Sequence, residues 1–207
     1  MDGIISVERD HIFDDAIYYR SGGIRLQYES ETDHVGGIKE GILLEAGFDT
    51  VTPNRPVTIS SWAYNKAKET ASIEILDNRA IDVLCYHPGY TFVEKLQTIA
   101  TKFRQEQSGE KERPNFMRQY YDVYCLLGNE EVRKFIGTAE YEAHKQKRFP
   151  KADLEIPISE NEAFLLSEPE VWADFRKRYM ETAPLYYNGQ PDFEELLRRI
   201  NSYLDRL

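Results

Sequence analysis

The hydrophobic pattern of this chain changes at Pro88-Gly89, and that change limits the folds open to it. Before this point, short stretches alternate apolar and polar side chains or form brief apolar runs, as strands do. After it, apolar residues recur at spacings of three and four, which is typical of amphipathic helices. We therefore predict an α+β protein, with a mixed β-sheet in residues 1–90 and a helical region in residues 91–207, packed as one structural unit.

The first part contains three predicted strands, in Gly23–Glu29, Gly41–Phe48 and Ala80–Tyr86. Turns are expected at Gly22-Gly23 and Gly36-Gly37, because paired glycines interrupt strands. Pro53 and Pro56 predict an irregular connection, since proline cannot donate to a strand ladder. Residues 60–71 fit a short helix and a strand equally well.

The second part contains five predicted helices, at about residues 92–103, 117–127, 129–147, 167–180 and 191–207. Asn129 is a suitable cap for the third, and Ser167 with Glu170 has the spacing of a capping box for the fourth. The second helix is expected to end at Gly128. Residues 105–114 and 150–167 are predicted to be loops.

The composition, with 41% apolar and 30% charged residues, fits a soluble globular protein, and its low cysteine content fits a cytoplasmic one. There is no run of 18 apolar residues, so no transmembrane helix is expected. The first ten residues lack the basic and apolar segments of a signal peptide. Cys85 and Cys125 are too few for a disulfide framework, and both are expected to be buried free thiols.

The charge balance limits the partners of the chain. Its 26 basic and 36 acidic residues give a net charge of −10, which disfavours non-specific binding to a nucleic-acid backbone. A basic cluster at residues 144–148 is the obvious candidate for a local RNA-binding patch. The same cluster also fits a solvated helix end, where cations offset the helix dipole.

Three charged residues stand where a purely structural element does not need them. Glu45 interrupts an apolar strand, and it is either a metal ligand or a side chain that points outward into water. Lys95 opens the first long helix, where it can bind phosphate or form an ordinary surface salt bridge. Asp122 lies in a crowded apolar segment, four residues after Arg118. It either pairs with Arg118 along the helix or points into an active cleft.

Other chemistries find little support in the sequence. His87 has no second His or Cys at metal-ligand spacing, so a zinc site is not expected. The phosphate-binding, dinucleotide-binding and hydrolase-elbow motifs are all missing. Tyr120, Tyr121 and Tyr124 are interpreted as packing residues first and base-stacking residues second.

Two segments, Glu94–Lys102 and Arg118–Leu127, resemble the two C-terminal motifs of the AbiEii/AbiGii-type nucleotidyltransferase toxin family. Lys95 matches the lysine of the first motif. Thr98 and Lys102 replace the alanine and arginine that follow it in the family. Asp122 matches the second acid of the last motif, whereas the first acid is replaced by Gln119. The resemblance extends over about residues 23–127.

The resemblance implies a function and a set of site residues. It implies transfer of a nucleotide from a nucleoside triphosphate to an RNA or protein acceptor, with Mg²⁺, opposed by a cognate antitoxin. Asp122 is the implied catalytic residue and Glu45 the implied metal ligand. Lys95, Lys102 and Arg118 are the implied nucleotide-binding residues. Glu45, Lys95 and Asp122 are then expected to surround one hollow.

The front motifs of the family are not found before Glu45. These are a Gly-Gly/Ser-Thr-Ala-Leu turn and a strand with two alternating aspartates; Asp14-Asp15 is adjacent rather than alternating. We therefore expect a truncated nucleotidyltransferase-like protein with little activity of its own. The alternative is a non-catalytic interaction protein that forms homo-oligomers through an exposed sheet edge.

Overall fold

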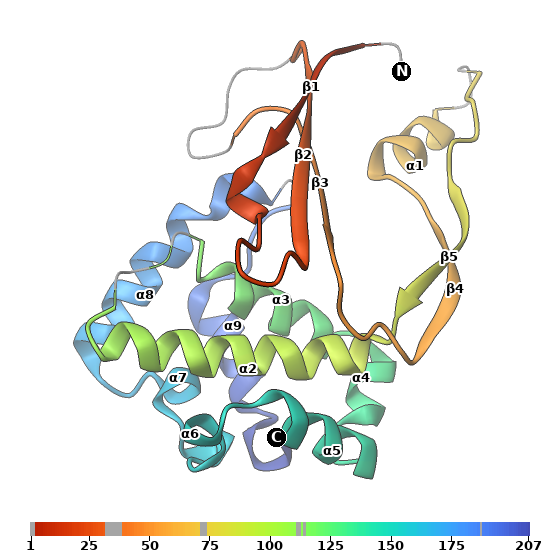
Figure 1. Cartoon of the computed structure of the whole chain (residues 1–207). Coiled ribbons are helices and arrows are strands. Elements are labelled where there is room, and N and C mark those ends of the chain that lie inside the picture. Colours follow the sequence, from red (N-terminus) through yellow and green to blue (C-terminus); the bar gives the residue numbers. More distant parts are fainter. Residues whose placement is uncertain (1–2, 32–38, 71–73, 111–112, 114, 187) are drawn as a thin grey trace. The chain divides into compact units, whose positions relative to one another are not determined.

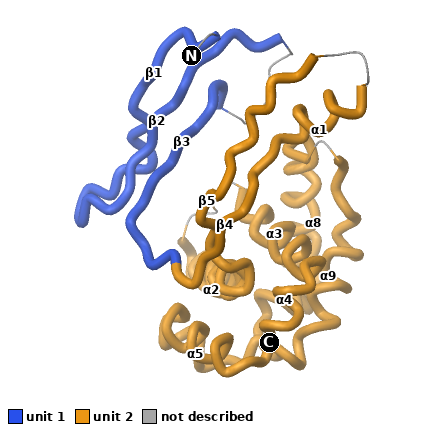
Figure 2. Tube along the Cα trace, turned by 90° about the vertical axis from the view of Figure 1, so that its right-hand side faces the viewer, with its two compact units in different colours: residues 1–51 blue, residues 52–207 orange. Residues whose placement is uncertain are grey.

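The computed structural model spans residues 1–207 and describes residues 3–31, 39–70, 74–110, 113, 115–186 and 188–207. The chain divides into two compact units, residues 1–51 and residues 52–207 (Figure 2). Each unit has its own antiparallel sheet, and the α-helices of the described ranges all belong to the second unit. The turn predicted at Gly36-Gly37 lies outside the described residues.

The first unit is a three-stranded sheet with the order β1-β2-β3. Its strands are β1 (Ile4–Asp10), β2 (Ser21–Tyr28) and β3 (Ile42–Gly47). The strands predicted around residues 23–29 and 41–48 are therefore confirmed. The alternation rule misses β1, because polar and charged side chains interrupt its apolar run. A single 3₁₀ turn, η1 (His11–Phe13), follows it.

The two faces of this sheet differ in polarity. Residues directly opposite one another in neighbouring strands share a face. Val7 pairs with Leu26, and Leu26 pairs with Ile42, so these three side chains share one apolar face. Ile42 and Leu44 on this face are 48% and 50% exposed.

The second unit begins with an antiparallel ribbon of β4 (Asn54–Ile59) and β5 (Ala80–Tyr86). The strand predicted at residues 80–86 is confirmed. The irregular connection predicted between Pro53 and Pro56 is wrong, because β4 runs through Pro56. A two-stranded ribbon leaves one edge of each strand unpaired, so the missing N–H of Pro56 is tolerated.

The segment between these strands contains α1 (Trp62–Glu69), which settles the choice between helix and strand for residues 60–71. Ser61 caps it by accepting a hydrogen bond from the Tyr64 N–H at 3.0 Å. The α+β class is confirmed. The expectation of a mixed sheet is wrong for the described strands, which all pair antiparallel. In the first sheet, strands consecutive in the chain are neighbours, and such neighbours need no parallel crossover.

The central helix of the second unit is α2 (Pro88–Gln107), the longest helix among the described residues (Figure 1). The His87 side chain caps it by accepting a hydrogen bond from the Gly89 N–H at 3.1 Å. The predicted apolar stripe is confirmed, and its buried members are Phe92, Leu96, Ile99 and Phe103. The helix extends into the predicted loop at residues 105–114, of which residues 111, 112 and 114 lie outside the described part.

Three helices follow the connection after α2: α3 (Arg118–Leu127), α4 (Glu130–Phe135) and α5 (Ala139–Arg148). Gly128 follows α3 as predicted. The single helix predicted at residues 129–147 is wrong, because the chain breaks between α4 and α5. Gly137 there has a φ of +80°, which L-residues with a side chain rarely adopt. Thr138 then caps α5 through the Tyr141 N–H.

The predicted loop at residues 150–167 contains three short helical turns, α6 (Lys151–Leu154), η2 (Ile158–Glu160) and α7 (Glu162–Leu165). The capping box predicted at Ser167 is wrong, because the Ser167 hydroxyl donates to Glu162 Oε1 at 2.7 Å. Pro169 instead occupies the first turn of the next helix. The remaining elements are α8 (Pro169–Glu181), η3 (Ala183–Leu185), α9 (Phe193–Asn201) and η4 (Leu204–Arg206).

The main core of the chain lies in the second unit. Tyr120 of α3 is fully buried, and its hydroxyl donates to the main-chain oxygen of Ala163 at 2.7 Å. The inward side predicted for the last helical segment is confirmed, with Phe193, Leu196, Leu197, Ile200, Leu204 and Leu207 all buried. No helix within the described ranges combines the length and apolar character needed to cross a membrane.

Candidate functional site

Lys95 and Asp122 form an ion pair between α2 and α3. Lys95 Nζ lies 2.8 Å from Asp122 Oδ2 and donates a hydrogen bond to Gln119 Oε1 at 3.1 Å. The two charged side chains are 31% and 40% exposed. The residues that follow them, Leu96 and Val123, are fully buried, so helix packing fixes the pair in place. Two residues singled out by the sequence thus meet at a position open to solvent.

Lys102 lies two turns beyond Lys95 on the same face of α2. It is half-buried, and its side chain makes no hydrogen bond or ion pair with any other residue that the structure describes. Burial lowers the pKa of Lys102, nearby Arg113 and Lys95 lower it further, and Glu106 partly opposes them. An unpaired, partly dehydrated cation beside other cations favours the binding of an anion.

Arg113 is a site residue that the sequence reasoning missed. Its main-chain N–H donates to Glu106 Oε1 at 2.9 Å, and its guanidinium donates to Gln105 Oε1 at 2.7 Å. These contacts bring Arg113 to the end of α2, close enough to Lys102 to lower the pKa of that lysine. No motif signals this residue, because it lies in a polar connection without helical or strand periodicity.

Glu106 is itself fixed by α8. Arg178 donates two hydrogen bonds to its carboxylate, at 3.0 and 3.1 Å, and the side chains of Arg178 and Glu106 are 14% and 5% exposed. The Arg178 guanidinium carbon also lies 5.0 Å from the ring centroid of Phe175 and 5.8 Å from that of Phe116. The connection that carries Arg113 is therefore attached to a buried ion pair.

Arg118, the first residue of α3, does not pair with Asp122. Asp122 is engaged by Lys95 instead, so the interpretation of Arg118 and Asp122 as a structural pair along the helix is wrong. Arg118 is exposed and lies near enough to Tyr186 to lower the pKa of its phenol, against the larger effect of burial. Its charge therefore faces a different part of the site from Lys102.

Tyr121, next to Asp122 on α3, stacks on Tyr186. The ring centroids are 4.0 Å apart and the ring planes differ by 30°. Burial raises the pKa of Tyr121 to about 12, and the adjacent Cys125 thiol contributes. Both cysteines are free, but Cys125 is exposed and Cys85 is only partly buried, which corrects the expectation of buried thiols. Cys125 is exposed because it lies on the side of α3 away from buried Tyr120.

Glu45, the implied metal ligand, belongs to the first unit. It lies in β3 opposite Gly23, and its side chain is exposed. The hollow expected between Glu45, Lys95 and Asp122 stays a prediction, because Glu45 and the other two residues belong to different units. Within the described ranges, no three His, Cys, Asp or Glu side chains are grouped so as to hold a metal ion. The described donors therefore do not fit Mg²⁺, which needs several oxygen ligands.

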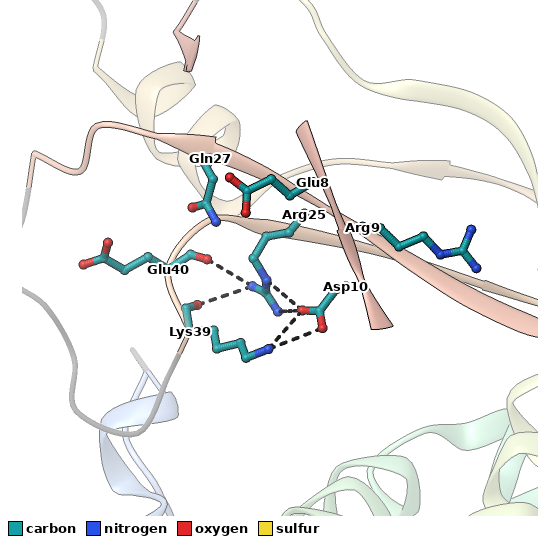
Figure 3. Close-up of a pocket in the computed structure, with 7 residues that line it drawn as sticks. All are labelled: Glu8, Arg9, Asp10, Arg25, Gln27, Lys39 and Glu40. Atoms are coloured by element: carbon teal, nitrogen blue, oxygen red, sulfur yellow. Dashed lines mark hydrogen bonds and ion pairs between the residues drawn. The ribbon is translucent and has the colours of Figure 1, made fainter. Parts of the chain in front are cut away.

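A cavity of about 400 Å³ lies on the polar face of the first unit's sheet (Figure 3). Arg25 Nε donates to Asp10 Oδ2 at 3.0 Å, and Arg25 Nη1 donates to the main-chain oxygen of Glu40 at 3.1 Å. Lys39 Nζ reaches the same carboxylate at 3.3 Å. These cations, Arg25 above all, lower the pKa of Asp10. Arg25 and Lys39 both pair with Asp10, and Arg25 also donates to the main-chain oxygens of residues 39–41. These contacts are best explained as structural, because they hold residues 39–41 against the sheet.

The basic cluster at residues 144–148 is largely used in internal contacts. His144 is buried and lies 3.3 Å from Glu94 Oε1, which Arg148 also approaches at 3.4 Å. Lys145 Nζ donates to the main-chain oxygen of Leu207. Since α5 ends at Arg148, these contacts favour the helix-end interpretation over an RNA-binding patch.

The fold and the site together define an α+β protein with cationic and acidic side chains grouped on two adjacent helices of its second unit. Residues 2–199 match the family model described as nucleotidyl transferase AbiEii toxin, type IV toxin–antitoxin system. The chain belongs to this family, as the two helical motifs predicted. No curated protein and no solved structure matches it.

Proposed function

We propose that this chain is a nucleotidyltransferase-like toxin component that binds the phosphates of a nucleoside triphosphate on the α2–α3 face of its second unit. Lys95, Lys102 and Arg113 are the proposed phosphate-binding residues, and exposed Arg118 adds a fourth cation at the start of α3. The unpaired state of Lys102 is the observation that carries this proposal. Its half-buried charge is unfavourable until an anion pairs with it.

Asp122 is the proposed catalytic residue. In the absence of ligand it orients Lys95 through their ion pair. In the transfer step, the acceptor hydroxyl oxygen would bond to the α-phosphorus, pyrophosphate would leave, and Asp122 would take the hydroxyl proton. Lys95 would exchange its contact with Asp122 for a phosphate oxygen, which frees the carboxylate for that role.

The metal requirement limits the activity expected of this chain. Mg²⁺ is implied for the family, but the described residues offer Glu45 without the further grouped oxygen ligands that the ion needs. We therefore assign no step to a metal ion. The chain is expected to bind nucleoside triphosphates with little transfer of its own. Incubation with Mg²⁺, each labelled nucleoside triphosphate and bulk tRNA tests this, and robust labelling lost in Asp122→Asn would contradict it.

The family description names a toxin–antitoxin system. We propose accordingly that a cognate antitoxin opposes this protein and that its acceptor is an RNA or a protein. For an RNA acceptor, recognition by specific local contacts is favoured, because the net charge of −10 repels a long polyanion.

Phosphate binding is tested by calorimetric titration of the whole chain with ATP and with inorganic tripolyphosphate. Lys102→Ala and Lys95→Ala are each expected to weaken binding about ten- to a hundredfold, since one charge-assisted hydrogen bond contributes about 1.5–3 kcal/mol. Lys134→Ala is the matched control, because Lys134 pairs with Glu130 on α4 and both side chains are largely exposed. Equal affinities for wild type and Lys102→Ala would refute the proposed site.

A second candidate function is that of a non-catalytic interaction protein, the alternative reached from the sequence. The observation in its favour is the apolar face of the first unit's sheet, where Val7, Ile42 and Leu44 are exposed. Large exposed apolar patches often mark interfaces, and the outer edges of β1 and β3 lack a strand partner among the described residues. Light scattering at several protein concentrations decides this point: a strict monomer argues against self-association.

A further inference from the structure

The tyrosines of the second unit fall into two groups by the use of their hydroxyls. Tyr120, Tyr141 and Tyr179 are buried, and each donates to a main-chain oxygen at 2.7, 2.9 and 2.9 Å respectively. These are core tyrosines with satisfied polar ends. Tyr121 and Tyr186 are only partly buried and stack on each other. Their arrangement is not that of a core tyrosine.

The hydroxyl contacts of this stack are also unlike those of the core tyrosines. The Tyr186 hydroxyl is buried and has no hydrogen bond of good geometry among the described residues, although Thr182 lies close enough to act on it. The pKa of the Tyr186 phenol is raised by burial first, and Thr182 partly offsets this. The Tyr121 hydroxyl lies against the Cys125 thiol. Neither hydroxyl therefore anchors its ring to the main chain, and the aromatic faces remain the defining feature of the pair.

The stack borders the proposed phosphate site. Positions 118, 121, 122 and 125 share one face of α3, since they are spaced by three and four residues. Tyr186 lies against this face, because its ring stacks on that of Tyr121, and the charges of Arg118 and Asp122 both affect the pKa of its phenol. Asp122 contacts Lys95 on its other side. The aromatic pair and the cations are therefore adjacent to the same carboxylate.

We infer that the Tyr121–Tyr186 stack is the platform for the base of the nucleoside triphosphate whose phosphates are bound by Lys95 and Lys102. This inference rests on the proposed function and assigns it a base-binding element. Aromatic rings bind any nucleobase by stacking, and a purine offers the larger surface. Arg118, at the edge of the stack, supplies a cation for the ribose or phosphate side of the ligand.

The test compares ATP with inorganic tripolyphosphate, which has the phosphates but no base. Wild-type protein is expected to bind ATP about tenfold more tightly than tripolyphosphate, in line with the contribution of one stacked base. Tyr186→Ala should remove this preference while leaving tripolyphosphate affinity unchanged. Tyr186→Phe keeps the ring and should keep the preference. Lys102→Ala should weaken both ligands equally.

A second variant covers the case in which Tyr186→Ala does not fold. Tyr186→Trp retains a stacking surface and adds a fluorophore, whose emission should be quenched by ATP and not by tripolyphosphate. Equal binding of ATP and tripolyphosphate by wild type, or an ATP preference that survives in folded Tyr186→Ala, would overturn the platform. If the wild type binds ATP with the expected dependence on Tyr186 but does not bind tripolyphosphate, the phosphate site is refuted and the platform is supported.

Discussion

Replacing Arg178 by methionine tests whether the buried ion pair at the end of α2 stabilises the second unit. Arg178 Nη1 and Nη2 donate to Glu106 at 3.0 and 3.1 Å, in a pair whose side chains are 14% and 5% exposed. In the variant, the Glu106 carboxylate keeps only the Arg113 N–H, at 2.9 Å. Removing one partner of a buried ion pair costs about 3–5 kcal/mol, because the other charge stays buried and uncompensated.

Methionine retains part of the packing of Arg178. The guanidinium carbon lies 5.0 and 5.8 Å from the ring centroids of Phe175 and Phe116, and the thioether can fill much of the same space. The lost cation–π contacts add about 0.5–1 kcal/mol. The expected loss in the free energy of unfolding is therefore about 3.5–6 kcal/mol, a large share of the roughly 5–15 kcal/mol typical of natural domains.

Urea unfolding followed by circular dichroism at pH 7 measures this loss. Arg176→Met is the matched control on the same helix, because Arg176 pairs with Glu194 where both side chains are largely exposed. It should cost less than about 1 kcal/mol.

The double variant Glu106→Gln, Arg178→Met should recover part of the loss in stability, since glutamine is uncharged and can still accept a hydrogen bond from the Arg113 main-chain N–H. A cost for Arg178→Met no larger than that of the control would refute the reasoning.

For three further substitutions, the structure predicts whether the free energy of unfolding rises or falls. Lys102→Met should raise the free energy of unfolding by about 0.5–1 kcal/mol, because burial lowers the pKa of Lys102 and so penalises its charge at neutral pH. This penalty disappears only as the pH rises above that pKa. If the same stabilised variant binds tripolyphosphate more weakly, Lys102 is a functional residue. Gly89→Ala should lower stability by about 1–3 kcal/mol in thermal unfolding, since its Cβ would lie 2.5 Å from Phe135 Cδ1. Tyr120→Phe should cost about 1–3 kcal/mol in urea unfolding by leaving the buried Ala163 carbonyl without its donor.

The helical part of the fold could be predicted because burial there follows a simple period. Leu96 and Ile99 of α2 and Leu196 and Ile200 of α9 all point inward as their spacing indicates. The break between α4 and α5 could not be predicted this way. It depends on the left-handed backbone of Gly137, a single residue within an otherwise helical pattern.

The residues of the candidate site could be predicted from the sequence only where they belong to a family motif. Lys95 and Asp122 were identified through the family resemblance, and their contact follows from the packing of α2 against α3. The spacing rule suggested Arg118 as the partner of Asp122, and it failed because a cation from another helix lies closer. Tyr186 and Arg113 had no local signal, because each joins the site through a tertiary contact from an irregular segment.

The electrostatics of the site depend on how its acids are used rather than on their number. The chain carries an excess of acidic residues, yet Asp122 is occupied by Lys95 and Glu106 by Arg178. The Lys102 side chain therefore makes no ion pair in the described part of the chain, within a protein whose overall field is negative. Such a local field can hold a small polyanion, because it acts at contact distance, whereas the net charge acts at longer range and is screened by salt. Binding of tripolyphosphate should accordingly depend on Lys102 far more than on the net charge, so that Lys102→Ala has a larger effect than Lys134→Ala, which changes the net charge equally.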